Sequence, residues 1–242
     1  MERAEGLERQ TVGRSGRMNV AVYLKWDSEV FGLDVAKMYI GENDQVSQEE
    51  IAQKCDRFDV VFVTTKRWVE FPSPFVPPGL DYLYDMESGP LASMPGSRVT
   101  TMSGPSDRHL EIARTSFRDS RFLRDPRLEG KAGEMYARWV SAGRVHVLVN
   151  EPDSAFMVTK RDADGAARIS LIAVDEQCRR LGLGETLVQD VLDQSPGIWR
   201  VKVSARNHRS IRFYEKNGFI VKDAWTAFHV WPADWKVKEY KR

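Results

Sequence analysis

Apolar residues in the second half of the chain follow a regular order of alternating and helical spacings. Alternation over four to eight residues predicts half-buried strands, and apolar positions three and four apart predict amphipathic helices. Turn residues at 150–153 separate two of these segments as in a hairpin. The expected elements are strands at 144–149, 155–159, 167–174 and 199–203 and helices at 184–194 and 207–218.

The first half contains a smaller set of elements before two turn-rich stretches. Ser47 and Glu50 have the spacing of a capping box, which supports a helix start. The Pro-rich stretch 71–79 can be neither helix interior nor central strand, and the turn-rich run 88–96 precedes a new strand at 99–103. We expect strands at 20–26, 35–40 and 60–64, a helix at 47–58, and three units: a flexible tail at 1–17, a small α/β unit at 18–96 and a second domain at 97–242.

The junction 169–184, with the sequence ISLIAVDEQCRRLGLG, joins a strand to a helix through a turn with two glycines. The first turn of a helix has unpaired N–H groups and the positive end of the helix dipole, so it attracts anions. At Gly182 and Gly184 a side chain would stand between this backbone and a bound anion. The junction therefore predicts a phosphate or pyrophosphate site, although a tight turn alone also explains two glycines.

Two common nucleotide sites are excluded at this junction. A Walker loop needs a lysine and a hydroxyl residue after its second glycine, but Glu185 and Thr186 follow Gly184. A dinucleotide fingerprint needs a third small residue where Leu187 stands, and an acidic residue after the next strand, which ends in Ser204. A different phosphate ligand is therefore expected.

Composition sets broad limits. Lysines and arginines number 36 against 35 aspartates and glutamates, which argues against a nucleic-acid partner and a polybasic membrane patch. No apolar run approaches the length of a membrane span, and the start of the chain lacks a secretory apolar region. The two cysteines, Cys55 and Cys178, are too distant in sequence to form a disulfide framework, which favours the cytoplasm. Cys178 has no second ligand at metal spacing, so we expect no metal.

Residues 174–219 resemble the acetyl-CoA motif of the GNAT superfamily of N-acyltransferases. The segment 179–184 resembles the loop that holds the CoA pyrophosphate, and VKVSARNHRSIRFYEKNGF at 201–219 resembles the second half of that motif. The resemblance implies a GNAT fold of the α/β (α+β) class, with a mixed, mostly antiparallel sheet flanked by helices, and acetyl-CoA as co-substrate. The implied cofactor-binding residues are Leu171, Ile172, Ala173, Val174, Arg179, Arg180, Leu181, Gly182, Leu183, Gly184, Asn207 and Tyr214.

Particular roles follow from that resemblance. Backbone N–H groups of residues 171–174 would bind pantetheine and the thioester carbonyl. Asn207 would either bind pantetheine or only cap its helix. Tyr214 would be the catalytic residue, as general acid to the departing thiolate. Because a phenol has a pKa near ~10 and a thiol near ~8.5, full proton transfer is uphill by roughly 2 kcal/mol in water, so Tyr214 is expected to act chiefly as a hydrogen-bond donor.

Residues 24–33 and 117–139 resemble bacterial TDP-fucosamine acetyltransferases, which acetylate TDP-4-amino-4,6-dideoxygalactose. The matching residues are Trp26, Phe31 with Gly32, Ser120 to Phe122, and Tyr136 to Trp139. This implies a nucleotide-linked amino sugar as acceptor, a role in cell-surface polysaccharide biosynthesis, and a cytoplasmic enzyme. The expected acceptor-binding residues are Arg121, Phe122, Trp26, Phe31 and Tyr136, and for each aromatic residue a place in the core is at least as well supported.

Two other functions stay open at this point. The chain would be a GNAT acetyltransferase for another small amine or a protein N-terminus, or a CoA-binding module without turnover. The resemblance also implies a homodimer formed through the exposed edge of the terminal strands.

Overall fold

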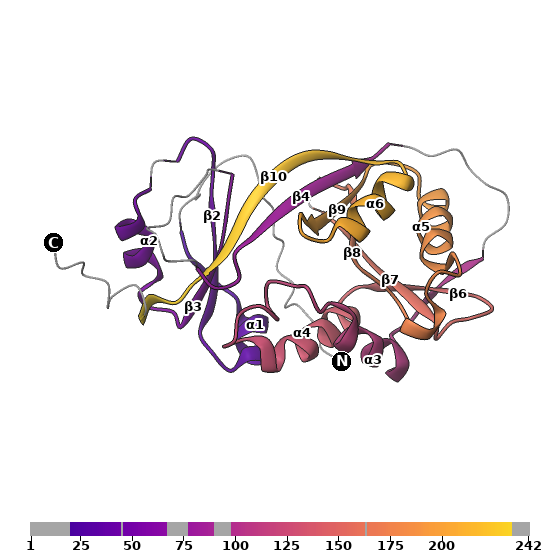
Figure 1. Ribbon diagram of the computed structural model, residues 1–242, viewed down its shortest axis with the longest axis horizontal. Coiled ribbons are helices and arrows are strands. Elements are labelled where there is room, and N and C mark those ends of the chain that lie inside the picture. Colours follow the sequence, from indigo (N-terminus) through magenta and orange to yellow (C-terminus); the bar gives the residue numbers. More distant parts are fainter. Residues whose placement is uncertain (1–19, 45, 67–76, 90–97, 163, 234–242) are drawn as a thin grey trace.

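The computed structural model describes residues 20–44, 46–66, 77–89, 98–162 and 164–233 (Figure 1). The strands of these residues form one ten-stranded sheet in the order β1-β2-β3-β10-β4-β9-β8-β7-β6-β5. Only the pairs β2–β3 and β8–β9 are parallel, which confirms the expected mixed, mostly antiparallel sheet. The strands are β1 (Val22–Tyr23), β2 (Val35–Ile40), β3 (Val60–Thr65), β4 (Asp81–Ser88), β5 (Val99–Met102), β6 (Arg144–Leu148), β7 (Ala155–Arg161), β8 (Ala167–Val174), β9 (Trp199–Ser204) and β10 (Phe219–Val230).

Helices cover both faces of this sheet. One large apolar cluster joins it to α1, α3 and α4, and two further clusters join the opposite face to α2, α5 and α6. We call these the α4 face and the α5 face. Within the described ranges, every helix is too short or too polar to span a bilayer. The helices are α1 (Lys25–Phe31), α2 (Gln48–Cys55), α3 (Asp107–Ser116), α4 (Glu129–Ser141), α5 (Leu183–Gln194) and α6 (His208–Lys216).

The elements expected in the second half are all present to within about two residues at each end. Alternation in β9 places Val201 and Val203 in the cluster beneath α5 and α6. The predicted capping box at α2 is also confirmed, because Ser47 and Glu50 each bond to the other's backbone amide. That helix ends at Cys55, three residues earlier than expected.

One prediction for the N-terminal segment is wrong: residues 20–26 do not form a single strand. β1 contains only Val22 and Tyr23, and Trp26 lies in α1. Ser28 decides this, because its hydroxyl bonds to the Leu24 carbonyl and accepts the Val35 amide, which folds the chain back at once. Gly32 then ends the helix in the left-handed conformation, with φ of 65°.

The position of β4 was not predicted, and it changes how the two halves of the chain relate. β4 lies between β10 and β9, and β10 also pairs with β3, so strands of the expected N-terminal unit share one sheet with the later strands. The expected dimer through the edge of the terminal strands stays a prediction: β10 lies between β3 and β4 in the sheet, but it pairs with β3 only from Thr226 to Val230. The tail 1–17, most of the Pro-rich stretch and residues 90–96 lie outside the described residues, and the boundary at 96 stays a prediction.

A buried polar contact fixes β10 to the segment before α4. The carboxylate of Asp125 accepts hydrogen bonds from His229 Nδ1 at 2.7 Å and Trp231 Nε1 at 2.9 Å. His229 and Asp125 have no exposed surface. The His229 ring lies directly over Gly79, where a Cβ would come within 2.4 Å of the ring. Gly79 is therefore required both for its φ of 63° and for the space the ring needs.

We predict that Gly79→Ala lowers the free energy of unfolding by roughly 2–4 kcal/mol, because left-handed strain and overpacking both act there. Gly165→Ala is the matched control: its φ is 85° but no atom lies within 4 Å of the added Cβ. It should cost only about 1–2 kcal/mol. Chemical denaturation measures both, and equal losses would contradict the packing role of Gly79.

A second prediction concerns pH. Burial lowers the pKa of His229 and of His146 to about 4. Each ring is neutral when folded, so as pH falls from about 6.5 to 4 the unfolded chain takes up protons first and stability is lost, by up to about 3 kcal/mol per ring. His146→Gln should reduce this slope of unfolding free energy against pH. An unchanged slope in His146→Gln would contradict the prediction.

Candidate functional site

The two parallel strands β8 and β9 separate halfway along β8. Their pairing runs from Ala167–Trp199 to Ile169–Val201 and stops there. Ser170 is an extra residue in the ladder with β7, a β-bulge that puts Ile169 in the cluster of the α5 face and Leu171 in that of the α4 face. β9 continues with β4 as far as Ser204. The edge of β8 at residues 171–174 is therefore without a strand partner on that side.

The chain leaves β8 through a loop of tightly held backbone. Asp175 accepts the Gln177 amide at 3.0 Å and pairs with Arg108. The hydrogen bond from that amide, and after it the Arg108 guanidinium, hold the pKa of Asp175 below its usual range. Arg180 and Gly182 both have left-handed backbone, with φ of 69° and 80°. Alternating left-handed residues turn successive amides toward one side, as in anion-binding nests.

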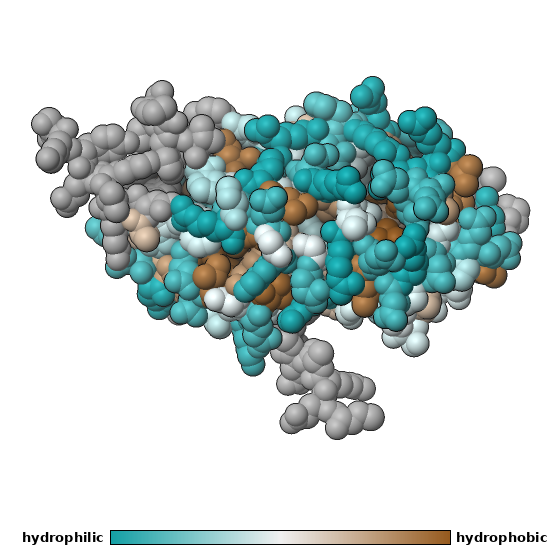
Figure 2. All heavy atoms as spheres, turned by 60° about the horizontal axis from the view of Figure 1, so that its bottom comes forward, coloured by the Kyte–Doolittle hydropathy of each residue, from teal (hydrophilic) through white to brown (hydrophobic). Residues whose placement is uncertain are grey.

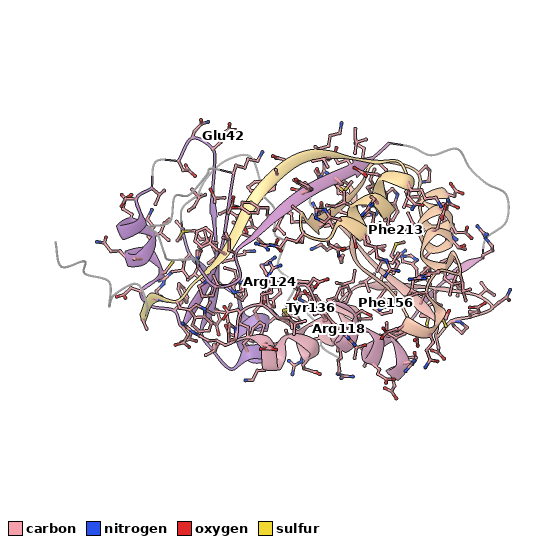
Figure 3. The ribbon with its side chains drawn as sticks, in the orientation of Figure 1. Glu42, Arg118, Arg124, Tyr136, Phe156 and Phe213 are labelled. Carbon is pink, nitrogen blue, oxygen red and sulfur yellow. The ribbon has the colours of Figure 1, made fainter. Side chains whose placement is uncertain are left out.

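The loop leads directly into the N-terminus of α5. Gly182 precedes this helix, and no atom lies within 4 Å of the position of a Cβ there. A Cβ on Gly184 would meet Val174 of β8 and Phe213 of α6, both at 3.5 Å. The start of α5, the end of β8 and α6 thus meet at one point (Figure 3). The first amides of a helix have no partner within the helix, so this place can hold an anion.

The two arginines of the loop differ in their surroundings. Arg179 donates from Nε to the Val174 carbonyl at 3.3 Å, so it braces the loop against β8. Arg180 is exposed. Leu181 is also exposed, and Leu183 packs against the cluster of the α5 face.

Tyr214 of α6 packs in the cluster that also contains Val203 of β9, with Ile172 and Val174 of β8 against it. Its ring contacts Phe213 and Phe219 edge to face. Only 4% of its surface is exposed, and its hydroxyl makes no hydrogen bond within the described part of the chain. Burial raises the pKa of Tyr214 well above its ordinary value. The phenol is a protonated donor with no partner of its own.

The surroundings of Asn207 and Cys178 indicate structural positions. The side chain of Asn207 accepts the Ser210 amide at 3.0 Å, so it caps α6. Its NH₂ group stays available as a donor. Cys178 is a free thiol at the end of a short 3-10 turn, Glu176–Cys178, and the described residues hold no cluster of three metal-ligating side chains around it or elsewhere.

The five acceptor residues expected from sequence lie together on the α4 face, but most are core residues. Phe31 and Phe122 are buried and stack with ring centroids 6.3 Å apart, and Tyr136 contacts Phe122 edge to face. Trp26 is half-buried and stacks on Trp139. Packing thus accounts for the aromatic residues. Arg121 lies over the Phe122 ring at 4.4 Å and remains the candidate with polar chemistry.

A set of polar residues that sequence analysis did not assign to a site lies on the α4 face in the middle of the sheet. Asp85 Oδ2 accepts the Trp225 indole N–H at 2.8 Å and lies 3.5 Å from Lys202 Nζ, and Arg168 Nη1 is 3.8 Å from its other oxygen. We call Asp85, Arg168, Lys202 and Trp225 the charged floor. Arg124 and Tyr136 lie on the side of α4 that faces β4 and β10 (Figure 3).

The charged floor is reached by solvent although helices lie over the same face. Lys202 keeps 34% and Asp85 25% of its side-chain surface exposed. From the side on which α1, α3 and α4 lie, the molecule is mostly hydrophilic with smaller hydrophobic areas (Figure 2). Arg200 and Lys202 alternate with apolar residues in β9, which places them on the face opposite to α5 and α6. Only the neighbouring strands and helices decide what lies opposite them.

The region around this site is similar to known proteins. Residues 141–221 match the family model described as "Acetyltransferase (GNAT) domain". Over 145 residues the chain is 23% identical to the spore coat polysaccharide biosynthesis protein SpsD of Bacillus subtilis (strain 168), a match covering 53% of this chain and 48% of that protein. The chain thus spans about half the length of this curated relative.

One solved structure resembles most of this fold. A functionally unknown conserved protein from Staphylococcus epidermidis ATCC 12228 has a TM-score of 0.60 at 9% identity, over 90% of this chain and 93% of that one. A GCN5-related N-acetyltransferase from Sphaerobacter thermophilus has a TM-score of 0.43 at 15% identity, over 76% and 65%.

The family match begins at the end of α4 and ends in β10, so it contains the separated strands, the loop and Tyr214. It also contains the whole acetyl-CoA motif expected at 174–219. Residues 141–221 therefore form a GNAT acetyltransferase domain.

Proposed function

We propose that the chain is an N-acetyltransferase that moves the acetyl group of acetyl-CoA to the amino group of a nucleotide-linked amino sugar. The observation that carries the donor half is the separation of β8 from β9 beside the loop at 179–184 within a GNAT domain. For the acceptor half, support comes from the charged floor, from Arg121, and from the likeness to a polysaccharide biosynthesis protein.

The residues fit a direct transfer. The neutral amine attacks the thioester carbon, the C–N bond forms, the C–S bond breaks, and the amine proton passes to water. Amides at the free edge of β8, residues 171–174, donate hydrogen bonds to the carbonyl oxygen as it gains charge. Tyr214 donates a hydrogen bond to the sulfur, where negative charge collects. Its raised pKa keeps it protonated, which suits a donor better than an acid that must give up its proton fully.

Amides of the loop and of the start of α5 hold the pyrophosphate of CoA in this proposal, with Arg180 free to pair with it. Only the NH₂ group of Asn207 would bind CoA, because its side-chain oxygen already accepts the Ser210 amide in the helix cap. The donor site and the charged floor would then lie on either side of the opening between β8 and β9, so that amine and thioester meet there.

The loop generates one prediction. Gly182→Val should weaken CoA binding roughly tenfold, since a β-branched residue disfavours the left-handed conformation that aims the amides and places a side chain over them. Gly165→Val is the control, with the same backbone strain at the other end of β8 and open space around it. Calorimetric titration with CoA measures both affinities. Wild-type affinity in Gly182→Val would refute the assignment of the loop.

A second prediction concerns Tyr214. Tyr214→Phe should lower kcat roughly 10- to 100-fold and leave the Kd of acetyl-CoA and the melting temperature nearly unchanged, because the hydroxyl has no hydrogen-bond partner among the residues that the structure describes. Thiol release from acetyl-CoA, measured with TDP- and UDP-linked amino sugars and with peptide amines for comparison, gives kcat. An unaltered kcat would rule out Tyr214 as the donor, and turnover of peptide amines alone would refute the sugar acceptor.

A further inference from the structure

Arg121 differs from the other arginines of its segment in having no partner. Arg124 pairs with Asp81 at 3.2 Å and bonds to the Leu80 carbonyl, and Arg118 donates to the Thr115 carbonyl. The Arg121 guanidinium only lies on the Phe122 ring and makes no ion pair or hydrogen bond with a described residue. Burial lowers the pKa of Arg121, although Tyr136, Asp81, Tyr39 and Asp27 favour its charge. The Arg121 side chain is half-buried. Even partial burial of a cation without an ion pair is unfavourable, so this position suits an anion.

Lys202 of the charged floor faces the same place. Its pKa is lowered, first by burial and then by the charges of Arg168 and Arg121, while Asp85 opposes the shift. Arg168 is already paired with Asp162 at 2.7 Å. Asp85 is shared between Lys202, Arg168 and the Trp225 N–H. Ser204, two residues after Lys202 in β9, donates from Oγ to Asp81 at 2.7 Å, and Arg124, three residues after Arg121, pairs with the same Asp81 at 3.2 Å. The segment that carries Arg121 therefore lies against the part of β9 that carries Lys202.

The position of these two cations separates them from the CoA loop. Lys202 points to the α4 face, whereas its neighbours Val201 and Val203 point to the α5 face, where the start of α5 lies. With 34% of its side chain exposed, Lys202 can be reached by a ligand from solvent. An anion bound here would be a different one from the CoA pyrophosphate.

We propose that Arg121 and Lys202 form the subsite for the diphosphate of the acceptor. This rests on the proposed function, because it identifies the charged part of the nucleotide-linked substrate. The planar guanidinium can bind two phosphate oxygens at once, and the lysine supplies a point charge to the second phosphate. A diphosphate can contact both cations together: Arg121, which has no ion pair with a described residue, and Lys202, which only shares Asp85 with Arg168. The subsite also gives a reason for a half-buried arginine that has no ion pair among the described residues.

The test measures diphosphate binding apart from catalysis. Wild type, Arg121→Met, Lys202→Met and the control Arg118→Met are titrated calorimetrically with dTDP, UDP and inorganic pyrophosphate in saturating CoA, which occupies the loop. We expect diphosphates to bind wild type and Arg118→Met equally, and each of the other two variants at least about tenfold more weakly, as for loss of one charge-assisted interaction. A nucleoside monophosphate or acetate should bind far more weakly.

Thermal unfolding without ligand gives an independent measurement. If Arg121 is held for an anion, Arg121→Met should keep or raise the melting temperature and lose the stabilisation that dTDP gives wild type. A purely structural arginine would instead lower the melting temperature when replaced. Lys202→Met removes a partly exposed cation, so it tests the same subsite even if Arg121→Met fails to fold.

Three results would overturn the proposal. In the first, wild type does not bind diphosphates in the presence of CoA. In the second, all four proteins bind them equally. In the third, diphosphates bind without CoA and saturating CoA displaces them, which would place them in the CoA loop. The proposed acetyltransferase activity is judged separately by thiol release with an amine acceptor. Turnover without diphosphate binding would refute the subsite and support the proposed activity. Diphosphate binding without turnover would support the subsite and refute the proposed activity.

Discussion

The separation of β8 from β9 is the constraint on which the site depends. A sheet strand normally pairs on both sides, but here one extra residue at Ser170 changes which side chains face each cluster, and pairing with β9 ends at Ile169. β8 then stays with β7 while β9 stays with β4. The backbone groups freed by this separation are the ones that an acyl donor needs, and they are held in place by a strand paired on its other edge.

The second feature of the fold is the way β10 and β4 extend the sheet. Because β10 pairs with β3 on one side and β4 on the other, the first strands of the chain are continuous with the GNAT domain. This brings α1, the segment before α4 and the middle of the sheet to one face. The side chains there include several charges that a sheet under helices would not normally carry, and most are paired through carboxylates of β4.

On the α4 face, a well-packed support carries a cation that adds little to stability. The Asp125–His229–Trp231 contact and the aromatic cluster around Phe122 are well-packed and fix the segment that carries Arg121. Among the described residues, Arg121 itself contacts only the ring of Phe122 in this support. A rigid support for an unpaired cation is what a preorganised anion site requires, since no reorganisation is then needed on binding.

The sequence by itself determined the elements from β6 to α6, the loop with its glycines and the family to which the loop and Tyr214 point. Their patterns are local: a period of two or 3.6, a cap at Asn207, a glycine after α6. It did not reveal β4, the helix at Trp26 or the charged floor. Those depend on contacts between distant segments, such as Ser28 with Val35, Asp85 with Trp225 and Arg124 with Asp81. Whether a polar residue on a strand faces solvent or a binding site is decided only by what packs opposite it, and that is a property of the tertiary structure.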